Sequence, residues 1–140
     1  MPTVSVIIHT FNNEDFIAET VESVISQTYN DYEIIVVDDG SEDGTRDALL
    51  PYMQGIRYHY KENGGIASAK NAGISLSNAE FVAFLDHDDL WVPEKLKIQM
   101  EHFNSNPQVG LVYAKYTSFR NDKELRTKPE KGYSGWIFKE

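Results

Sequence analysis

Val4-Ser5-Val6-Ile7-Ile8 is the run of residues from which the architecture of this chain can be worked out. It is short, apolar and rich in β-branched side chains, which is typical of a buried strand. From Glu14 to Ser26, apolar residues then return at intervals of three and four, the spacing of one buried helix face. Together the two stretches predict a strand followed by a helix.

The same unit recurs along the chain. The other expected strands are 33–37, 56–60, 81–85 and 109–113, and the other expected helices are 45–53, 66–77 and one that begins at Pro93. Strand 81–85 is continuously apolar, so we expect it to be covered on both faces. The alternation predicts an α/β fold with a mostly parallel sheet and helices on both faces.

Length and charge limit the function. The chain has 140 residues, a formal net charge of −9 and no cysteine. We expect one domain over 1–140. The acidic balance argues against nucleic acid and anionic membrane surfaces as partners, and the lack of cysteine excludes a disulfide framework and a thiolate metal site.

Location and completeness are also predicted from the pattern. No basic leader and no apolar run of roughly 20 residues is present, which favours a cytoplasmic protein, with membrane association of a longer parent left open. After Tyr113 the pattern weakens, and Asn121-Asp122 predicts a hairpin at the sheet edge. The apolar stretch 135–140 looks like the opening of a further element, so we expect a C-terminally truncated chain. An edge exposed in this way makes self-association plausible.

Polar residues follow three of the predicted strands. They are His9-Thr10-Phe11-Asn12, Asp38-Asp39-Gly40-Ser41 and Asp86-His87-Asp88-Asp89. Parallel sheets bind ligands at the carboxyl ends of their strands, so these residues are the candidates for a site. Like charges resist ionising together, and a positive group is therefore expected among the aspartates.

Asp86 and Asp88 are the candidate metal ligands. In extended backbone, residues two apart point the same way, which puts both carboxylates together and turns His87 aside. Paired carboxylates suit Mg²⁺ or Mn²⁺, which keep waters and take other ligands from phosphates. Such a metal would let an acidic protein bind an anionic diphosphate. The alternative is a polar loop whose carboxylates cap the following helix.

Three other signals have two interpretations each. Asp38-Asp39-Gly40-Ser41 is either part of a site or a strand-to-helix turn with Asx-type hydrogen bonds, and only one of its aspartates is expected to enter a pocket. Asn63-Gly64-Gly65 is either a phosphate cradle or a plain turn. Phe11 is either a core residue or a platform on which a base stacks.

With these residues in view, the chain resembles the family-2 glycosyltransferases over nearly all of its length. The resemblance rests on five stretches in order: 4–12 with Glu14; Ser26-Gln27-Thr28-Tyr29; 37–41 with Asp43-Gly44-Thr45; Asn63-Gly64-Gly65 with Ala69-Lys70-Asn71-Ala72-Gly73; and 84–89 with Pro93.

The resemblance implies a GT-A fold and the transfer of a sugar from a nucleotide diphosphate donor, with UDP as the first candidate, to a hydroxyl of a saccharide or other acceptor. It also implies that the reaction inverts the anomeric centre and depends on Mn²⁺ or Mg²⁺. By position, the resemblance implies that Asp39 accepts a hydrogen bond from the base and that the nucleotide is contacted by His9, Thr10, Phe11 and Glu14. It implies that Lys70 lies near the nucleotide, where the family has arginine. It also implies that Asp86 lies near the ribose and the metal, and that Asp88 is the principal metal ligand. His9 stands where the family usually has a small residue.

No general base is identified. Glu124 and Glu130 lack a supporting context, and in the family the base comes from the part beyond the first hundred or so residues. The chain is therefore expected to bind a donor without transferring its sugar. Two alternatives are a non-catalytic nucleotide-sugar-binding module and an aspartyl-phosphate phosphotransferase of the haloacid dehalogenase type. The second rests on Asp86-x-Asp88 after an apolar strand, although Leu90 stands at its threonine-like position.

Overall fold

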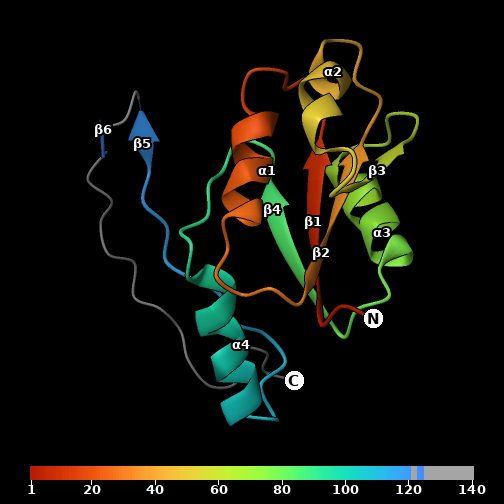
Figure 1. Cartoon of the computed structure of the whole chain (residues 1–140). Helices are drawn as coiled ribbons and strands as arrows, with labels where there is room; N and C mark the ends of the chain where they lie inside the picture. Colours follow the sequence, from red (N-terminus) through yellow and green to blue (C-terminus); the bar gives the residue numbers. More distant parts are fainter. Residues whose placement is uncertain (121–122, 125–140) are drawn as a thin grey trace. The chain divides into compact units, whose positions relative to one another are not determined.

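A computed structural model describes residues 1–120, 123 and 124 of the chain. Strands and helices alternate through the first hundred residues, as predicted (Figure 1). In chain order the elements are β1 (Val4–Thr10), α1 (Ile17–Ile25), β2 (Tyr32–Asp38), α2 (Thr45–Leu49), the 3₁₀ helix η1 (Leu50–Tyr52), β3 (Arg57–Tyr60), α3 (Ile66–Leu76), β4 (Phe81–Asp86), α4 (Lys95–Ser105), β5 (Phe119–Arg120) and β6 (Lys123–Glu124).

The first four strands form one parallel sheet in the order β3-β2-β1-β4. β1 lies inside the sheet and pairs with both β2 and β4. At its carboxyl end Thr10 is opposite Asp38, and His9 is opposite Asp86. The register therefore brings the polar ends of three strands to one edge, as the sequence predicted.

Helices cover both faces of the sheet. α3 packs on the face that carries Ile7, Ile35 and Val37, where Ala69 completes a fully buried cluster. Because side chains alternate along a strand, Val6 and Ile8 point to the opposite face, and both are fully buried. Figure 1 shows the strands running between α1 and α3. The predicted α/β architecture is confirmed.

Gly73 sets the closeness of α3 to β1. A Cβ at this position would stand well inside contact distance of Ile7 Cγ2 and 3.2 Å from Ile7 Cδ1. We expect Gly73→Ala to lower the free energy of unfolding in urea by about 1–3 kcal/mol, because overpacking outweighs the helix propensity of alanine. Asn71→Ala, at an exposed position of the same helix, is the matched control and should leave stability within about 0.5 kcal/mol of the parent. Stabilisation by Gly73→Ala would contradict the packing argument.

Two predictions about strands were wrong. Strand 81–85 was expected to be covered on both faces, but Val82 and Phe84 are 37% and 44% exposed. The reason is that β4 is an edge strand of the four-stranded sheet. Residues 109–113 were expected to form a strand, yet they have no ladder in the described part of the chain, and Leu111 is 59% exposed. Apolar composition alone does not make a strand without a neighbour to pair with.

Element boundaries also differ from the predictions. β1 and β2 each extend to include polar residues, so His9, Thr10 and Asp38 are the last residues of strands and do not follow them. α1 begins at Ile17, three residues later than expected, and the helix expected over 45–53 ends at Leu49 and continues as η1. Pairing in the ladder carries the strands past the apolar run.

Beyond α4 the structure is sparse. The hairpin expected near Asn121-Asp122 is present as β5 and β6, but it is a two-stranded sheet of its own and does not extend the main sheet. The contacts of the chain divide into two compact units, Met1–Met100 and Glu101–Glu140. The element expected at 135–140 and the side chains of Glu124 and Glu130 lie outside the residues described. None of the helices in the described ranges has the length and apolar content needed to cross a membrane.

Candidate functional site

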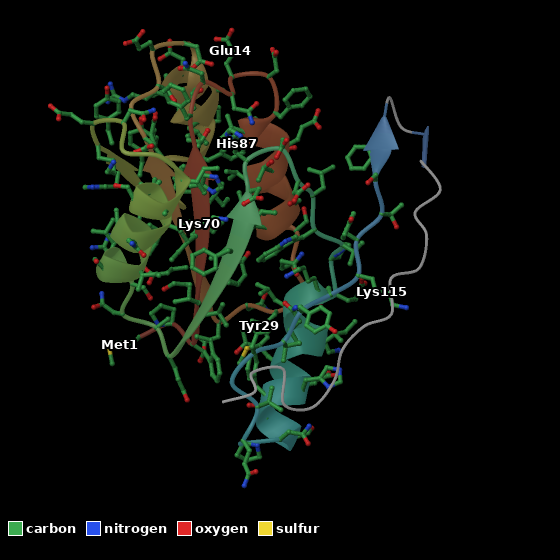
Figure 2. All side chains as sticks on the ribbon, turned by 180° about the vertical axis from the view of Figure 1, so that it is seen from behind. Met1, Glu14, Tyr29, Lys70, His87 and Lys115 are labelled. Atoms are coloured by element: carbon green, nitrogen blue, oxygen red, sulfur yellow. The ribbon has the colours of Figure 1, made fainter. Side chains whose placement is uncertain are left out.

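Most of the predicted site residues lie at the carboxyl ends of the strands. His9 and Thr10 end β1, Asp86 ends β4, and Lys70 reaches the same edge from α3. Figure 2 shows Lys70 and His87 beside the strands, with Glu14 lying away from both. The site is thus built on rigid elements, which hold its side chains more firmly than loops do.

Asp39 is buried and fully engaged with its own chain. Its side chain is 4% exposed, and Lys61 Nζ lies 2.5 Å from Oδ1. The backbone N–H groups of Gly64 and Gly65 donate to the same carboxylate, at 3.0 and 2.7 Å. Burial raises the pKa of Asp39, but the hydrogen bonds from Lys61 and the two N–H groups outweigh it and hold the pKa below its ordinary 3.8.

This arrangement decides between the two interpretations of Asn63-Gly64-Gly65. The segment does cradle an anion, with Gly65 at a φ of 83° that favours glycine, but the anion is the carboxylate of Asp39. The interpretation of this segment as a phosphate cradle is therefore wrong, because the N–H groups of Gly64 and Gly65 already donate to Asp39. A contact between Asp39 and a nucleobase stays a prediction.

Asp38 takes the structural role that the sequence left open. It is 1% exposed, and its Oδ1 accepts the N–H of Ser41 at 2.8 Å in an Asx-type turn. Its Oδ2 accepts the hydroxyl of Tyr58 at 2.6 Å, and burial together with this hydrogen bond raises the pKa of Tyr58. The two adjacent aspartates thus have separate partners, as strand alternation requires.

Glu14 is engaged in a contact between two loops. Its Oε2 accepts the N–H of Gly44 at 2.6 Å, and its own N–H donates to Asp43 at 3.1 Å. Burial raises the pKa of Asp43, but hydrogen bonds from Thr45 and from the Glu14 N–H outweigh it and lower the pKa. These contacts fix the loop before α1 to the start of α2, and a contact of Glu14 with a nucleotide stays a prediction.

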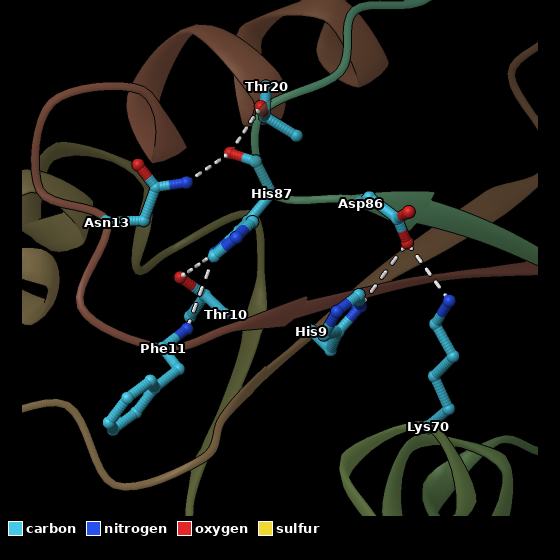
Figure 3. Close-up of polar contacts among 8 residues, drawn as sticks. All are labelled: His9, Thr10, Phe11, Asn13, Thr20, Lys70, Asp86 and His87. Carbon is cyan, nitrogen blue, oxygen red and sulfur yellow. Dashed lines mark hydrogen bonds and ion pairs between the residues drawn. The ribbon is translucent and has the colours of Figure 1, made fainter. Parts of the chain in front are cut away.

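Asp86, Lys70 and His9 form the charged part of the site (Figure 3). Lys70 Nζ lies 3.0 Å from Asp86 Oδ1, and His9 Nδ1 lies 3.6 Å from the same oxygen. That Nδ1 is a buried atom without a hydrogen-bond partner among the described residues. Burial, followed by the charge of Lys70, lowers the pKa of His9 below 6.5. The ring is therefore neutral at neutral pH.

His87 joins the site, contrary to the prediction that it turns aside. The N–H of Asp89 donates to the carbonyl of Asp86 at 3.1 Å, so the chain turns after β4 and is not extended there. The extended backbone that was expected to bring the carboxylates of Asp86 and Asp88 together is therefore wrong, and their binding of one metal stays a prediction. His87 Nδ1 lies 3.2 Å from Thr10 Oγ1, and its ring stacks on His9 with centroids 5.7 Å apart.

Phe11 is not a core residue. Its side chain is 42% exposed, and Figure 3 shows the ring directed away from the two histidines. The interpretation of Phe11 as a core residue is therefore wrong, and a stacking contact of its ring with a base stays a prediction.

The turn after β4 carries two accessible carboxylates. Asp88 is exposed, and half of the Asp86 side chain is exposed as well. Burial, with the charges of Asp88 and Asp86, raises the pKa of Asp89, which shows how crowded the negative charge is. Residues 1–120, 123 and 124 contain no group of three or more acidic or histidine side chains able to enclose a metal. Two accessible carboxylates with open positions suit Mg²⁺ or Mn²⁺, which complete their shell with water and phosphate.

Three functional contacts escaped the sequence reasoning. Lys61 is the ion-pair partner of Asp39, His87 binds the end of β1, and Asn13 donates from its side chain to the carbonyl of His87. All three join residues 22 to 77 positions apart, and no spacing rule on one chain reports such pairs.

Comparison with known proteins gives a consistent result. The family model described as glycosyl transferase family 2 matches residues 5–139. An uncharacterised glycosyltransferase of Rickettsia typhi is 40% identical over 137 residues, which cover 95% of this chain and 43% of the relative. WfaP of Escherichia coli, a UDP-Glc:alpha-D-GlcNAc-diphosphoundecaprenol beta-1,3-glucosyltransferase, is 39% identical and is covered to 47%. The chain thus spans less than half the length of these relatives.

Solved structures agree with the fold. TarS of S. aureus in complex with UDP matches with a TM-score of 0.71 and 29% identity, over 76% of this chain and 33% of TarS. The mannosyltransferase PcManGT of Pyrobaculum calidifontis, solved with GDP-Man and Mn²⁺, matches with a TM-score of 0.67 and 28% identity, over 78% of this chain and 34% of that one.

Proposed function

The chain belongs to glycosyltransferase family 2, and on that premise we propose that it binds a nucleoside diphosphate sugar, with UDP as the nucleotide, at the carboxyl ends of β1, β2 and β4. The observation that carries the proposal is the convergence of Asp86, Lys70 and His9 at one edge of the sheet, with Asp88 exposed on the adjoining turn. Support for UDP comes from TarS, solved with UDP, and from the UDP-Glc in the name of WfaP.

Each side chain of the site has a proposed task. Asp86 and Asp88 would hold Mn²⁺ or Mg²⁺, which when bound supplies Lewis-acid stabilisation of the departing diphosphate. Lys70 adds a cation beside the diphosphate, and Phe11 offers an exposed ring to the base. Thr10 and His9, buried at the end of β1, form the floor beneath the nucleotide.

The transfer itself is proposed to invert the anomeric centre. The acceptor hydroxyl oxygen forms the new bond to the anomeric carbon, the bond from that carbon to the diphosphate breaks, and the hydroxyl proton passes to a general base. We place that base outside the described residues and propose a saccharide hydroxyl as the acceptor. A non-catalytic binding module would take the same donor without this last step. Family membership speaks against the aspartyl-phosphate alternative.

Removal of metal gives the first test. Calorimetric titration of the folded chain with UDP in Mn²⁺ should give micromolar binding, and EDTA should weaken it by at least about tenfold, or about 1.4 kcal/mol. A bound cation would offset the repulsion between the carboxylates of Asp86 and Asp88 and the diphosphate, which is the reason for the expected difference. CDP is the matched control, since it has the same diphosphate and a different base edge, and GDP and TDP extend the series.

The outcomes of this titration separate the alternatives. A folded chain that binds none of UDP, GDP or TDP in Mn²⁺ contradicts the proposal. Equal binding in Mn²⁺ and EDTA contradicts the metal site alone. A separate incubation with a UDP-sugar and a saccharide tests the placement of the general base, which transfer of the sugar by this chain would contradict.

A further inference from the structure

We propose that His87 is a positioning residue that holds the metal-binding turn Asp86–Asp89 against the nucleotide-binding loop Thr10–Asn13, so that metal and nucleotide bind cooperatively. The inference rests on the proposed function and deepens it. Asp86 and Asp88 are proposed to hold the metal, and Thr10 and Phe11 to line the nucleotide. His87 is the residue that joins these two groups through its ring.

The ring contacts the end of β1. The backbone N–H of Phe11 donates to His87 Nδ1 at 3.4 Å, and Thr10 Oγ1 lies 3.2 Å from the same nitrogen (Figure 3). A backbone N–H is always a donor, so Nδ1 is the acceptor in this contact. The side chain of His87 therefore fixes the backbone at the very residue from which the nucleotide-binding loop departs.

The backbone of His87 is fixed independently. Its carbonyl accepts hydrogen bonds from Asn13 Nδ2 at 3.0 Å and from Thr20 Oγ1 at 2.9 Å. Thr20 is fully buried in α1, and its single hydroxyl proton is shared between this carbonyl and the carbonyl of Asp89, which lies 3.1 Å from Oγ1. These bonds use main-chain atoms of the turn, so they survive substitution of the His87 side chain. A variant of His87 thus loosens the Thr10–Phe11 end of the loop, while Asn13 still ties the other end to the turn and Thr20 still ties the turn to α1.

The ring also supports the charged part of the site. It stacks on His9 at 5.7 Å with an interplanar angle of 20°, and His9 faces Asp86. The His87 side chain therefore contacts the loop on one side and, on the other, His9, which lies beside the proposed metal ligand Asp86. If Asp86 and Asp88 hold a metal and Thr10 and Phe11 line the nucleotide, holding the turn and the loop together before binding would increase the affinity for both.

Substitutions of His87 test the inference. Asparagine places an acceptor oxygen close to the position of Nδ1, glutamine places its amide farther out, and alanine removes both. The measured quantity is the ratio of the UDP dissociation constants in EDTA and in Mn²⁺. We expect His87→Ala and His87→Gln to reduce this ratio by about tenfold, as loss of a supporting contact does at metal sites, and His87→Asn to retain it. His59→Ala, on β3 at the opposite edge of the sheet, is the histidine control and should keep the parental ratio.

Hydrogen exchange of the Phe11 amide reports the contact without any nucleotide. It should be faster in His87→Ala and His87→Gln than in the parent, and parental in His87→Asn. The inference is overturned if the ratio of dissociation constants stays parental in both His87→Ala and His87→Gln. It is also overturned if the ratio falls in His87→Asn as far as in His87→Gln while both variants remain folded. If His87→Ala does not fold, the asparagine and glutamine variants still decide. A parent chain that binds no nucleotide overturns the proposed function, whereas a metal-enhanced parent with unaffected His87 variants overturns this inference alone.

Discussion

The Asp88→Asn variant is expected to lose the metal-dependent part of UDP binding, with the dissociation constant in Mn²⁺ rising at least about tenfold, to its value in EDTA. Asparagine keeps the shape of the side chain and removes its charge, and a hard divalent cation depends on that charge. Asp86 would remain as the one proposed carboxylate ligand, and its Oδ1 is shared with Lys70 Nζ at 3.0 Å. Calorimetric titration with UDP in both buffers measures the effect.

A charge-matched control separates site chemistry from net charge. Asp47→Asn removes one negative charge from an exposed position on α2 and should leave UDP binding in Mn²⁺ and in EDTA at parental values. Retention of EDTA-sensitive binding by Asp88→Asn would show that another group holds the metal. Loss of binding in both buffers, with the variant folded, would show that Asp88 contacts the nucleotide directly.

The Asp39→Asn variant is expected to lose about 3 kcal/mol of unfolding free energy at pH 7, because it breaks a buried, hydrogen-bonded ion pair. The carboxylate accepts from Lys61 Nζ and from the N–H groups of Gly64 and Gly65. An asparagine amide has only one oxygen to accept from these donors. Its NH₂ group is itself a donor and cannot accept a hydrogen bond from the donor that it then faces. Urea denaturation measures the loss.

The pH dependence of this loss follows from the lowered pKa of Asp39. The unfolded carboxyl binds a proton at higher pH than the folded one, so the stabilisation is complete above the ordinary value of 3.8 and fades as the pH falls through the folded pKa. The difference between the parent and Asp39→Asn should therefore be constant from pH 5 to pH 7 and shrink below about pH 4.

Lys61→Met is the companion variant. It removes one donor, whose side chain is 21% exposed, and leaves both backbone N–H groups on Asp39. We expect it to lose less than half as much stability as Asp39→Asn. An Asp39→Asn variant within about 0.5 kcal/mol of the parent would contradict the anchoring role of Asp39.

Much of the fold was predictable because it depends on local patterns. The β-branched run at 4–8 and the helical spacing after it predict β1 and α1, and the repeat of this unit predicts the parallel sheet. Strand 109–113 shows the limit of the method. Its composition is that of a strand, but pairing is a property of two segments, and the described part of the chain supplies no partner for it.

The sequence predicted which residues belong to the site but not what each of them contacts. The carboxyl ends of parallel strands share an edge, so Asp39, Asp86 and His9 could be assigned to one region from order alone. Their tasks could not be assigned in the same way. Gly64 and Gly65 have the composition of a phosphate cradle, yet their N–H groups bind a carboxylate 25 and 26 residues earlier in the chain.

The sequence by itself determined which residues are apolar, where the chain turns and which acidic groups end the strands, because these depend on periodicity and residue type. Only the tertiary structure decided which of those groups face one another. Lys61 binds Asp39, and the ring of His87 binds the end of β1 from 76 residues away. The physical reason is that a hydrogen bond depends on a few tenths of an ångström and on direction, and both are set by the packing of separate elements and not by distance along the chain.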